Sequence, residues 1–449
     1  MENNNHTPGP SWKWAIPFFV TLGLLSALAF CLPLRPDFSQ SEKRELAKFP
    51  NFTWEALWSG DYFDDITLWF SDTFPGREGW LNLSAAMKSA QGYSDIAIEG
   101  QLPEPETIPP VTQPVEPQSP ETAMPAETQE QTSQETTDST ESWGGLDAAD
   151  DEQILFGGSV IQIGDSVFNA LGFSQQASDH YVDVVNRFTE AVSPLGTTVV
   201  SAPPPTAVGI LVEEAFQEKL RSVSQVDTLA YLHDSMDSRV VKVDTVGALL
   251  PHNSEYLYFR TDHHWTALGA YYSYQAVCQA LDMEPVDIST MEVWDQGVFH
   301  GSLFGRARNP GKLKADTVYA YVPKGDITAT AYSKEGNGRE ITILQDASHR
   351  DTNAKYLVFG TDYSLNHVVN HSLADAPDCL VIKDSFGNCF VPFLTQNFHN
   401  IYSVDYRKFR NIPLTQFVEQ YGVEYVIFMP YMTATQSGQG WQLIESLCF

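Results

Sequence analysis

The run Cys379-Leu380-Val381-Ile382-Lys383 leads directly into Asp384-Ser385-Phe386-Gly387-Asn388. Apolar residues followed by Asp, Ser and Gly are typical of a buried strand that ends in a tight turn before a helix. Ser385 would then lie at the carboxyl end of a strand, where open α/β sheets bind their ligands. The backbone N–H groups at the start of a helix can also stabilise an oxyanion there. Ser385 is therefore the candidate nucleophile.

Strands and helices alternate on both sides of this run. Apolar segments predict further strands at 160–163, 197–202, 240–243, 256–259, 401–404 and 425–429. Amphipathic or turn-bounded segments predict helices at 181–192, 266–281, 388–394 and 414–421. Such alternation implies crossover connections and a mostly parallel sheet covered by helices. We therefore expect the α/β class.

A second motif, Thr261-Asp262-His263-His264-Trp265, precedes the expected helix at 266–281. In an extended segment, side chains at i and i+2 point to the same side, so Asp262 and His264 can face one pocket. A serine hydroxyl becomes a good nucleophile when an imidazole takes its proton and a carboxylate orients that imidazole. His264 and Asp262 can supply both functions to Ser385.

Composition excludes several classes of protein. The chain has 449 residues and a formal net charge of −31, which disfavours nucleic acid as a partner because nucleic acids select clustered Lys and Arg. Its five cysteines form no CxxC motif and no spaced cluster with histidine, which argues against a zinc or disulfide framework. No cofactor is expected.

The remaining sequence divides into recognisable segments. Residues 14–34 lack charge and have the length of about 20 residues that crosses a bilayer, so they predict a transmembrane anchor after a cytoplasmic tail at 1–13. Residues 38–100 are rich in aromatics and are expected to pack on the main domain. Residues 101–152 carry 13 acidic residues and no Lys or Arg, which is typical of a disordered insert. The main domain is expected at 153–449.

The segment Phe259-Arg260-Thr261-Asp262-His263-His264-Trp265-Thr266-Ala267-Leu268-Gly269-Ala270 resembles the signature of the bacterial DHHW protein family. The order of this element and the later Ser385-Phe386 is similar to the SGNH-hydrolase-like domains of the alginate O-acetylation machinery. Elements of residues 41–77, such as Ser-Gly-Asp-Tyr-Phe and Phe-Pro-Gly-Arg, are similar to the segment that precedes the domain in both groups. The resemblance implies a three-layer, flavodoxin-like domain with a mostly parallel sheet.

The resemblance also implies roles and a location. Asp262 would orient the imidazole, His264 would be the general base and Ser385 would accept the acyl group. The chain would be a single-pass bacterial membrane protein whose main domain, outside the cytoplasm, acts as an O-acetyltransferase or acetylesterase on a cell-envelope polysaccharide. A separate membrane-bound acyltransferase would be its acetyl donor. For the oxyanion we expect the Ser385 N–H and Asn388, and for substrate contact Arg407 at the next strand end.

Several alternatives remain open at this point. Ser166, in Gly164-Asp165-Ser166, is the rival nucleophile, because it also follows an expected strand. His263 could replace His264 as the base if the segment were helical, and Asp262 could simply cap the following helix. Arg407 could only pair with Asp405. A metal bound by Asp262, His263 and His264 with His252 or His300 is disfavoured, since adjacent histidines seldom converge on one ion. The contrasting hypothesis is a noncatalytic surface protein that binds glycan or a partner.

Overall fold

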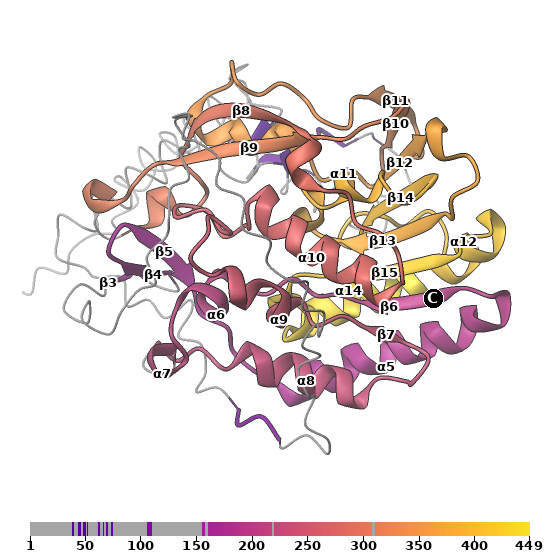
Figure 1. Ribbon diagram of the computed structural model, residues 1–449, viewed down its shortest axis with the longest axis horizontal. Helices are drawn as coiled ribbons and strands as arrows, with labels where there is room; N and C mark the ends of the chain where they lie inside the picture. Colours follow the sequence, from indigo (N-terminus) through magenta and orange to yellow (C-terminus); the bar gives the residue numbers. More distant parts are fainter. Residues whose placement is uncertain are drawn as a thin grey trace, which may run out of the picture. The chain divides into compact units, whose positions relative to one another are not determined.

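The computed structural model describes residues 155–157, 160–217, 220–307 and 310–449, together with short pieces between residues 38 and 109. The chain divides into two units, Met1–Ser94 and Asp95–Phe449. In the first unit, β1 (Phe38–Ser39) and β2 (Arg44–Glu45) form an antiparallel pair. The second unit contains the large sheet, whose strands are labelled in Figure 1.

The centre of the large sheet is β13 (Cys379–Lys383), in which every residue is buried. β14 (Asn400–Asp405) and β15 (Tyr425–Met429) pair with β13 in parallel, one on each side. Beyond β15 the parallel pairing continues through β6 (Thr198–Ser201) to β7 (Val241–Lys242). Parallel strands buried on both faces need nearly continuous apolar sequence, which is why β13, β14, β15 and β6 were predictable. The expected α/β class with a parallel sheet is confirmed.

The other edge of this sheet is antiparallel, which was not expected from the sequence. β12 (Leu365–Asn370) pairs antiparallel with β14, β10 (Ile327–Tyr332) with β12, and β11 (Gly338–Ile341) with β10. These strands include half-buried and exposed positions rather than a continuous apolar run. Antiparallel strands tolerate one solvated face, so their apolar signal is weaker.

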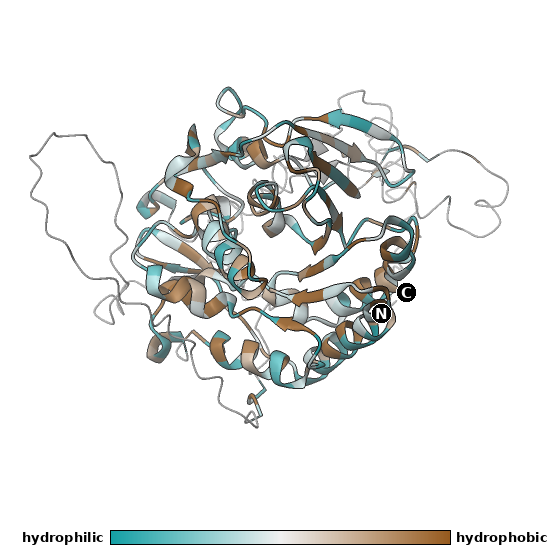
Figure 2. Cartoon of the chain, turned by 45° about the vertical axis from the view of Figure 1, so that its right-hand side comes forward, coloured by the Kyte–Doolittle hydropathy of each residue, from teal (hydrophilic) through white to brown (hydrophobic). Residues whose placement is uncertain are grey.

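Helices cover both faces of the sheet, as Figure 1 shows. Leu380 and Ile382 of β13 belong to one hydrophobic cluster, whereas Cys379 and Val381 belong to the other, because successive strand residues point to opposite faces. The first cluster includes residues of α5 (Gln175–Val192), α12 (Leu414–Tyr421) and α14 (Gly438–Cys448). The second includes residues of α6 (Ala207–Leu211), α9 (Thr245–Leu249), α10 (Ala267–Ala280) and α11 (Val391–Leu394). In Figure 2 the hydrophobic colour is accordingly strong on the central strands.

Further elements complete the second unit. The helices are α7 (Glu214–Gln217), α8 (Gln225–Ser235) and α13 (Met432–Thr435). A small antiparallel sheet contains β3 (Leu155–Gly157), β4 (Val160–Ile163) and β5 (Ser166–Asn169). β8 (Glu292–Phe299) and β9 (Asp316–Val322) form a separate antiparallel ribbon. The strand expected at 160–163 is therefore real, but it lies in the small sheet and not in the large one.

Near the two motifs, the structure differs from two elements that the sequence predicted. The strand expected at 256–259 is wrong, since only Tyr258 forms an isolated bridge, with Trp265. The reason is that the Leu257 N–H donates to the nearby Glu255 carbonyl at 2.8 Å and the Phe259 N–H to the His264 carbonyl at 3.3 Å, instead of to a neighbouring strand. The helix expected at 388–394 is shorter, because a 3-10 turn, η9 (Ser385–Asn388), precedes α11.

The segments expected before the main domain fall largely outside the described residues. This holds for the span at 14–34, for the tail before it and for most of 38–100 and of the insert at 101–152. Among the residues that the structure describes, no helix has both the length and the apolar character needed to cross a bilayer.

Candidate functional site

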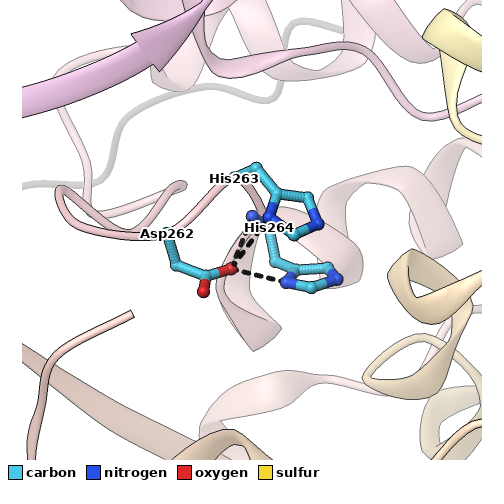
Figure 3. Close-up of side chains that lie close together, drawn as sticks. All are labelled: Asp262, His263 and His264. Carbon is cyan, nitrogen blue, oxygen red and sulfur yellow. Dashed lines mark hydrogen bonds and ion pairs between the residues drawn. The ribbon is translucent and has the colours of Figure 1, made fainter. Parts of the chain in front are cut away.

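A tight turn joins Asp262 to His264. Asp262 Oδ1 accepts the backbone N–H of His264 at 3.0 Å and lies 2.5 Å from Nδ1 of the same residue, as Figure 3 shows. A side chain that accepts the N–H two residues further on is an Asx turn. The two side chains therefore meet through a turn and not through the extended segment assumed from the sequence.

Backbone donors hold the Asp262 carboxylate in place. Asp262 is fully buried, and its Oδ2 accepts the N–H of Ser302 at 2.7 Å. Leu303 N–H donates to the Thr261 carbonyl at 2.9 Å, so the loop after β8 lines the turn on this side. Both carboxylate oxygens thus have donors, as a buried acid requires. The residue that caps α10 is Thr266, whose hydroxyl accepts the Gly269 N–H at 3.3 Å.

Ser385 lies at the other nitrogen of His264. Its Oγ is 2.7 Å from His264 Nε2, although the two residues are 121 positions apart in the chain. His264 is only 3% exposed, whereas Ser385 is half-buried. β13 delivers Ser385 to the carboxyl edge of the parallel sheet. The fold therefore builds a continuous hydrogen-bonded chain from Asp262 through His264 to Ser385.

Asp384 fixes the turn that carries the serine. Its carboxylate accepts the N–H groups of Phe386 at 3.0 Å and Tyr431 at 2.7 Å, and the Tyr406 hydroxyl at 3.2 Å. Burial raises the pKa of Asp384 above its usual value. Asp384 accepts the N–H of Phe386 and not that of Ser385, so the Ser385 N–H is not bound to this carboxylate.

Asn388 and Arg407 lie in one ionic network around Asp362. Asn388 accepts from Lys383 Nζ at 2.6 Å and donates to Asp362 at 2.9 Å. Arg407 donates to Asp405 at 2.9 and 2.6 Å and to Asp362 at 2.8 Å. Burial acts to raise the pKa of Asp362, but the Arg407 and Lys383 charges outweigh it and lower that pKa. Arg407 thus makes the ion pair with Asp405 that the sequence left as the alternative.

The rival residues have other partners. Ser166 begins β5, is fully buried, and donates its hydroxyl to Asp165 at 2.8 Å, whereas His264 contacts Ser385. His263 lies beside His264, with ring centroids 3.9 Å apart, but its Nδ1 is 3.0 Å from Ser302 Oγ. The imidazole in contact with the serine is that of His264.

Asp262, His263 and His264 also form a cluster with the geometry of metal ligands. Each offers one ligand atom, and these atoms lie within 4.8 Å of one another. Both ring nitrogens of His264 already contact Asp262 and Ser385, so a cation would have to break that chain. His252 Nδ1 lies 2.7 Å from Glu255, and His300 stacks on Phe304.

Sequence reasoning missed Tyr356, from the 3-10 segment η7 (Thr352–Phe359). Its ring stacks on His264 with centroids 4.5 Å apart and planes inclined by 16°. Its hydroxyl donates to the Ser385 carbonyl at 3.1 Å. No turn, spacing or charge pattern around Tyr356 pointed to this contact. Trp265 was noted in the motif, and its indole N–H donates to the Phe386 carbonyl at 2.9 Å.

Comparisons with known proteins agree with this architecture. Residues 42–115 and 137–404 match the family model described as DHHW protein. No curated protein matches the chain. A DHHW family protein from Eubacterium siraeum has a TM-score of 0.58 and 24% identity, over 69% of this chain and 99% of that chain.

Two further solved structures match the chain at lower identity. Bacillus cereus PatB1 with a sulfonyl adduct gives a TM-score of 0.52 at 16% identity, over 63% of this chain and 97% of that chain. The O-acetyltransferase domain of Pseudomonas putida AlgJ gives a TM-score of 0.36 at 13% identity, over 63% of this chain and 96% of that chain. The Eubacterium siraeum and Bacillus cereus proteins share the fold of this chain.

Proposed function

Because this chain belongs to the DHHW protein family, we propose that it is an O-acetyltransferase or acetylesterase of a cell-envelope polysaccharide. The observation that carries the proposal is the contact of Ser385 Oγ with His264 Nε2 at 2.7 Å, with Asp262 on the opposite nitrogen. This arrangement is the one that activates a serine hydroxyl for acyl transfer. The acetyl group and the glycan follow from the resemblance of the sequence motifs to alginate O-acetylation domains.

The first half of the reaction forms an acyl-enzyme. His264 Nε2 takes the proton of Ser385 as Oγ attacks the acetyl carbonyl of the donor ester, while Asp262 holds the Nδ1 proton. The negative charge that develops on the carbonyl oxygen is stabilised by N–H donors, and the Ser385 amide is the first donor that we assign. The imidazolium then gives its proton to the departing alcohol, and the acetyl group stays on Ser385.

The second half releases the acetyl group. His264 deprotonates either a sugar hydroxyl or a water molecule, which attacks the acetyl carbonyl on Ser385. The products are an acetylated glycan in the first case and acetate in the second, and Ser385 recovers its proton from His264. Exclusion of water from the site decides between the two outcomes.

The location and the donor are part of the same proposal. The uncharged residues 14–34 would anchor the chain in the cell membrane, with the main domain outside the cytoplasm. A separate membrane-bound acyltransferase would then supply acetyl groups to Ser385.

The proposal is tested with the full chain in detergent, incubated with p-nitrophenyl acetate in the presence and absence of cell-envelope glycan fragments. We expect release of p-nitrophenol, and acetylated fragments detected by mass spectrometry if transfer is the function. Acetate release without fragment acetylation would support the esterase. Release of p-nitrophenol no faster than in buffer would reject both activities and favour the noncatalytic glycan-binding hypothesis.

Gly301→Ala is expected to lower kcat for p-nitrophenyl acetate about 100-fold, since small misplacements of catalytic groups have effects of this size. A Cβ at Gly301 would lie 2.2 Å from the Asp262 Cβ and 2.5 Å from the Thr261 carbonyl oxygen. The carboxylate must therefore move relative to His264. Gly305→Ala is the matched control, because nothing lies within 4 Å of a Cβ there. Steady-state kinetics of both variants checks this, and equal rates would contradict it.

A further inference from the structure

One aromatic side chain contacts both the imidazole and the serine segment of the site. Tyr356 is buried, with 2% of its surface exposed, and its ring lies parallel to that of His264. Its hydroxyl donates to the carbonyl of Ser385 and lies 3.5 Å from the Cys389 sulfur. The three residues come from separate parts of the chain: Tyr356 from η7, His264 from the turn before α10, and Ser385 from the turn after β13.

We propose that Tyr356 is a positioning residue, which sets the plane of the His264 ring and holds the Ser385 backbone at the distance needed for proton transfer. The inference rests on the proposed acyl transfer and deepens it. Because the Tyr356 side chain is buried, we do not expect it to contact the substrate. Its effect should therefore appear in the chemical step and not in substrate affinity.

Stacking on Tyr356 restricts the tilt of the His264 ring, a motion that the hydrogen bond to Asp262 still allows. A hydrogen bond to Nδ1 fixes one edge of the imidazole, but the ring can still tilt about that bond. The Tyr356 face lies 4.5 Å from the His264 centroid, and Phe386 lies 4.9 Å from the same centroid. Two aromatic neighbours thus limit the tilt that would move Nε2 away from Ser385. An aromatic face also stabilises the cationic ring that forms when His264 takes a proton.

The hydroxyl of Tyr356 contacts the serine segment of the site, at the Ser385 carbonyl. Burial raises the pKa of Tyr356 well above its usual value, so the phenol remains a neutral donor. Its bond to the Ser385 carbonyl, at 3.1 Å, holds the backbone of the residue that carries the nucleophile. The two contacts tie the base and the nucleophile to one rigid ring.

Tyr356 is itself held by its surroundings. Its ring makes edge contacts with Phe359 at 5.2 Å and Phe259 at 6.0 Å. The segment η7 is tied at both ends, since the His300 N–H donates to the Thr352 carbonyl at 3.0 Å and the Gln345 N–H to the Val358 carbonyl at 2.8 Å. A side chain that positions a catalytic ring must itself have a fixed rotamer, and these contacts fix that of Tyr356.

The experiment separates the ring from the hydroxyl. Tyr356→Leu removes both contacts, and Tyr356→Phe keeps the stack but removes the hydrogen bond. With p-nitrophenyl acetate we expect kcat to fall about 100-fold in Tyr356→Leu, as for a misplaced catalytic group, and about tenfold in Tyr356→Phe, as for one lost hydrogen bond. KM should stay within a factor of two or so of wild type in both, because the substrate site is unchanged.

Tyr181→Leu is the matched control. Tyr181 is equally buried, but it lies in α5 within the cluster on the opposite face of the sheet. It should lower the melting temperature while leaving kcat at the wild-type value. If Tyr356→Leu does not fold, Tyr356→Met replaces it, and Tyr356→Phe gives an independent result for the hydroxyl.

The outcomes distinguish this inference from the proposed function. Wild-type protein without any esterase activity removes the proposed function and, with it, a role for Tyr356 in that reaction. Active wild type together with unchanged kcat in folded Tyr356 variants overturns only the inference. A loss of kcat that follows the melting temperature equally in the Tyr356 and Tyr181 variants would also overturn it, since a general packing role would suffice.

Discussion

Ser385→Ala is expected to lower kcat for p-nitrophenyl acetate by about 10⁴-fold or more, to the level supported by binding and oxyanion donors alone. The hydroxyl that His264 contacts at 2.7 Å is the only part of the side chain that the substitution removes. Stability should change little, because Ser385 is half-buried and the Asp384 contacts to the turn are made by the backbone N–H groups of neighbouring residues. Steady-state kinetics with thermal denaturation of each variant measures both.

Ser166→Ala is the matched control for this experiment. Like Ser385, Ser166 directly follows an aspartate, but its hydroxyl donates to that aspartate, Asp165, at 2.8 Å, and the residue lies in the small sheet. The Ser166 variant should therefore keep wild-type kcat. Activity that survives in Ser385→Ala and is lost in Ser166→Ala would show that Ser166, and not Ser385, is the nucleophile.

Asp262→Asn is expected to lower kcat by about 10⁴-fold, the size of effect associated with a wrong imidazole tautomer. The carboxylate, 2.5 Å from Nδ1, keeps the ring proton there and leaves Nε2 to accept from Ser385. An amide can donate to Nδ1 instead, which would put the proton on Nε2 and block its action as a base. The volume is unchanged, but the amide NH2 cannot accept the N–H of His264 or Ser302, so the melting temperature should also fall, and kcat is measured on protein that is still folded.

A neutral control for that substitution is Asp244→Asn. Asp244 Oδ1 also accepts a backbone N–H, that of Gly247 at 2.7 Å, but it does so at the start of α9. Asn caps helices as well as Asp, so activity and melting temperature should both be retained. Asp262→Asn activity within tenfold of wild type would contradict the orienting role.

The sequence allowed the centre of the fold and the core of the site to be predicted for physical reasons. β13, β14 and β15 are buried on both faces, so their apolar runs were unmistakable. The turn after β13 placed Ser385 at the sheet edge, and the spacing of Asp262 and His264 indicated a shared pocket. Their actual meeting through an Asx turn gave the same pairing by a different local geometry.

Other features depended on tertiary contacts that no local pattern carries. β10, β11 and β12 lack continuous apolar sequence because they form an antiparallel edge. The residues at 256–259 have strand-like composition, yet the N–H groups of Leu257 and Phe259 donate to the nearby carbonyls of Glu255 and His264. Tyr356, 92 positions after His264 by their numbers, has no sequence signal of its own, since its contacts with His264 and Ser385 arise only in the folded chain.

The most direct measurement of the central claim is peptide mapping by mass spectrometry after brief incubation of the full chain with p-nitrophenyl acetate and rapid acid quenching. We predict one acetyl group, on the peptide that contains Ser385, which is absent in His264→Ala. Acetylation of Ser166 instead, or turnover of the ester without any acetylated Ser385, would contradict the account.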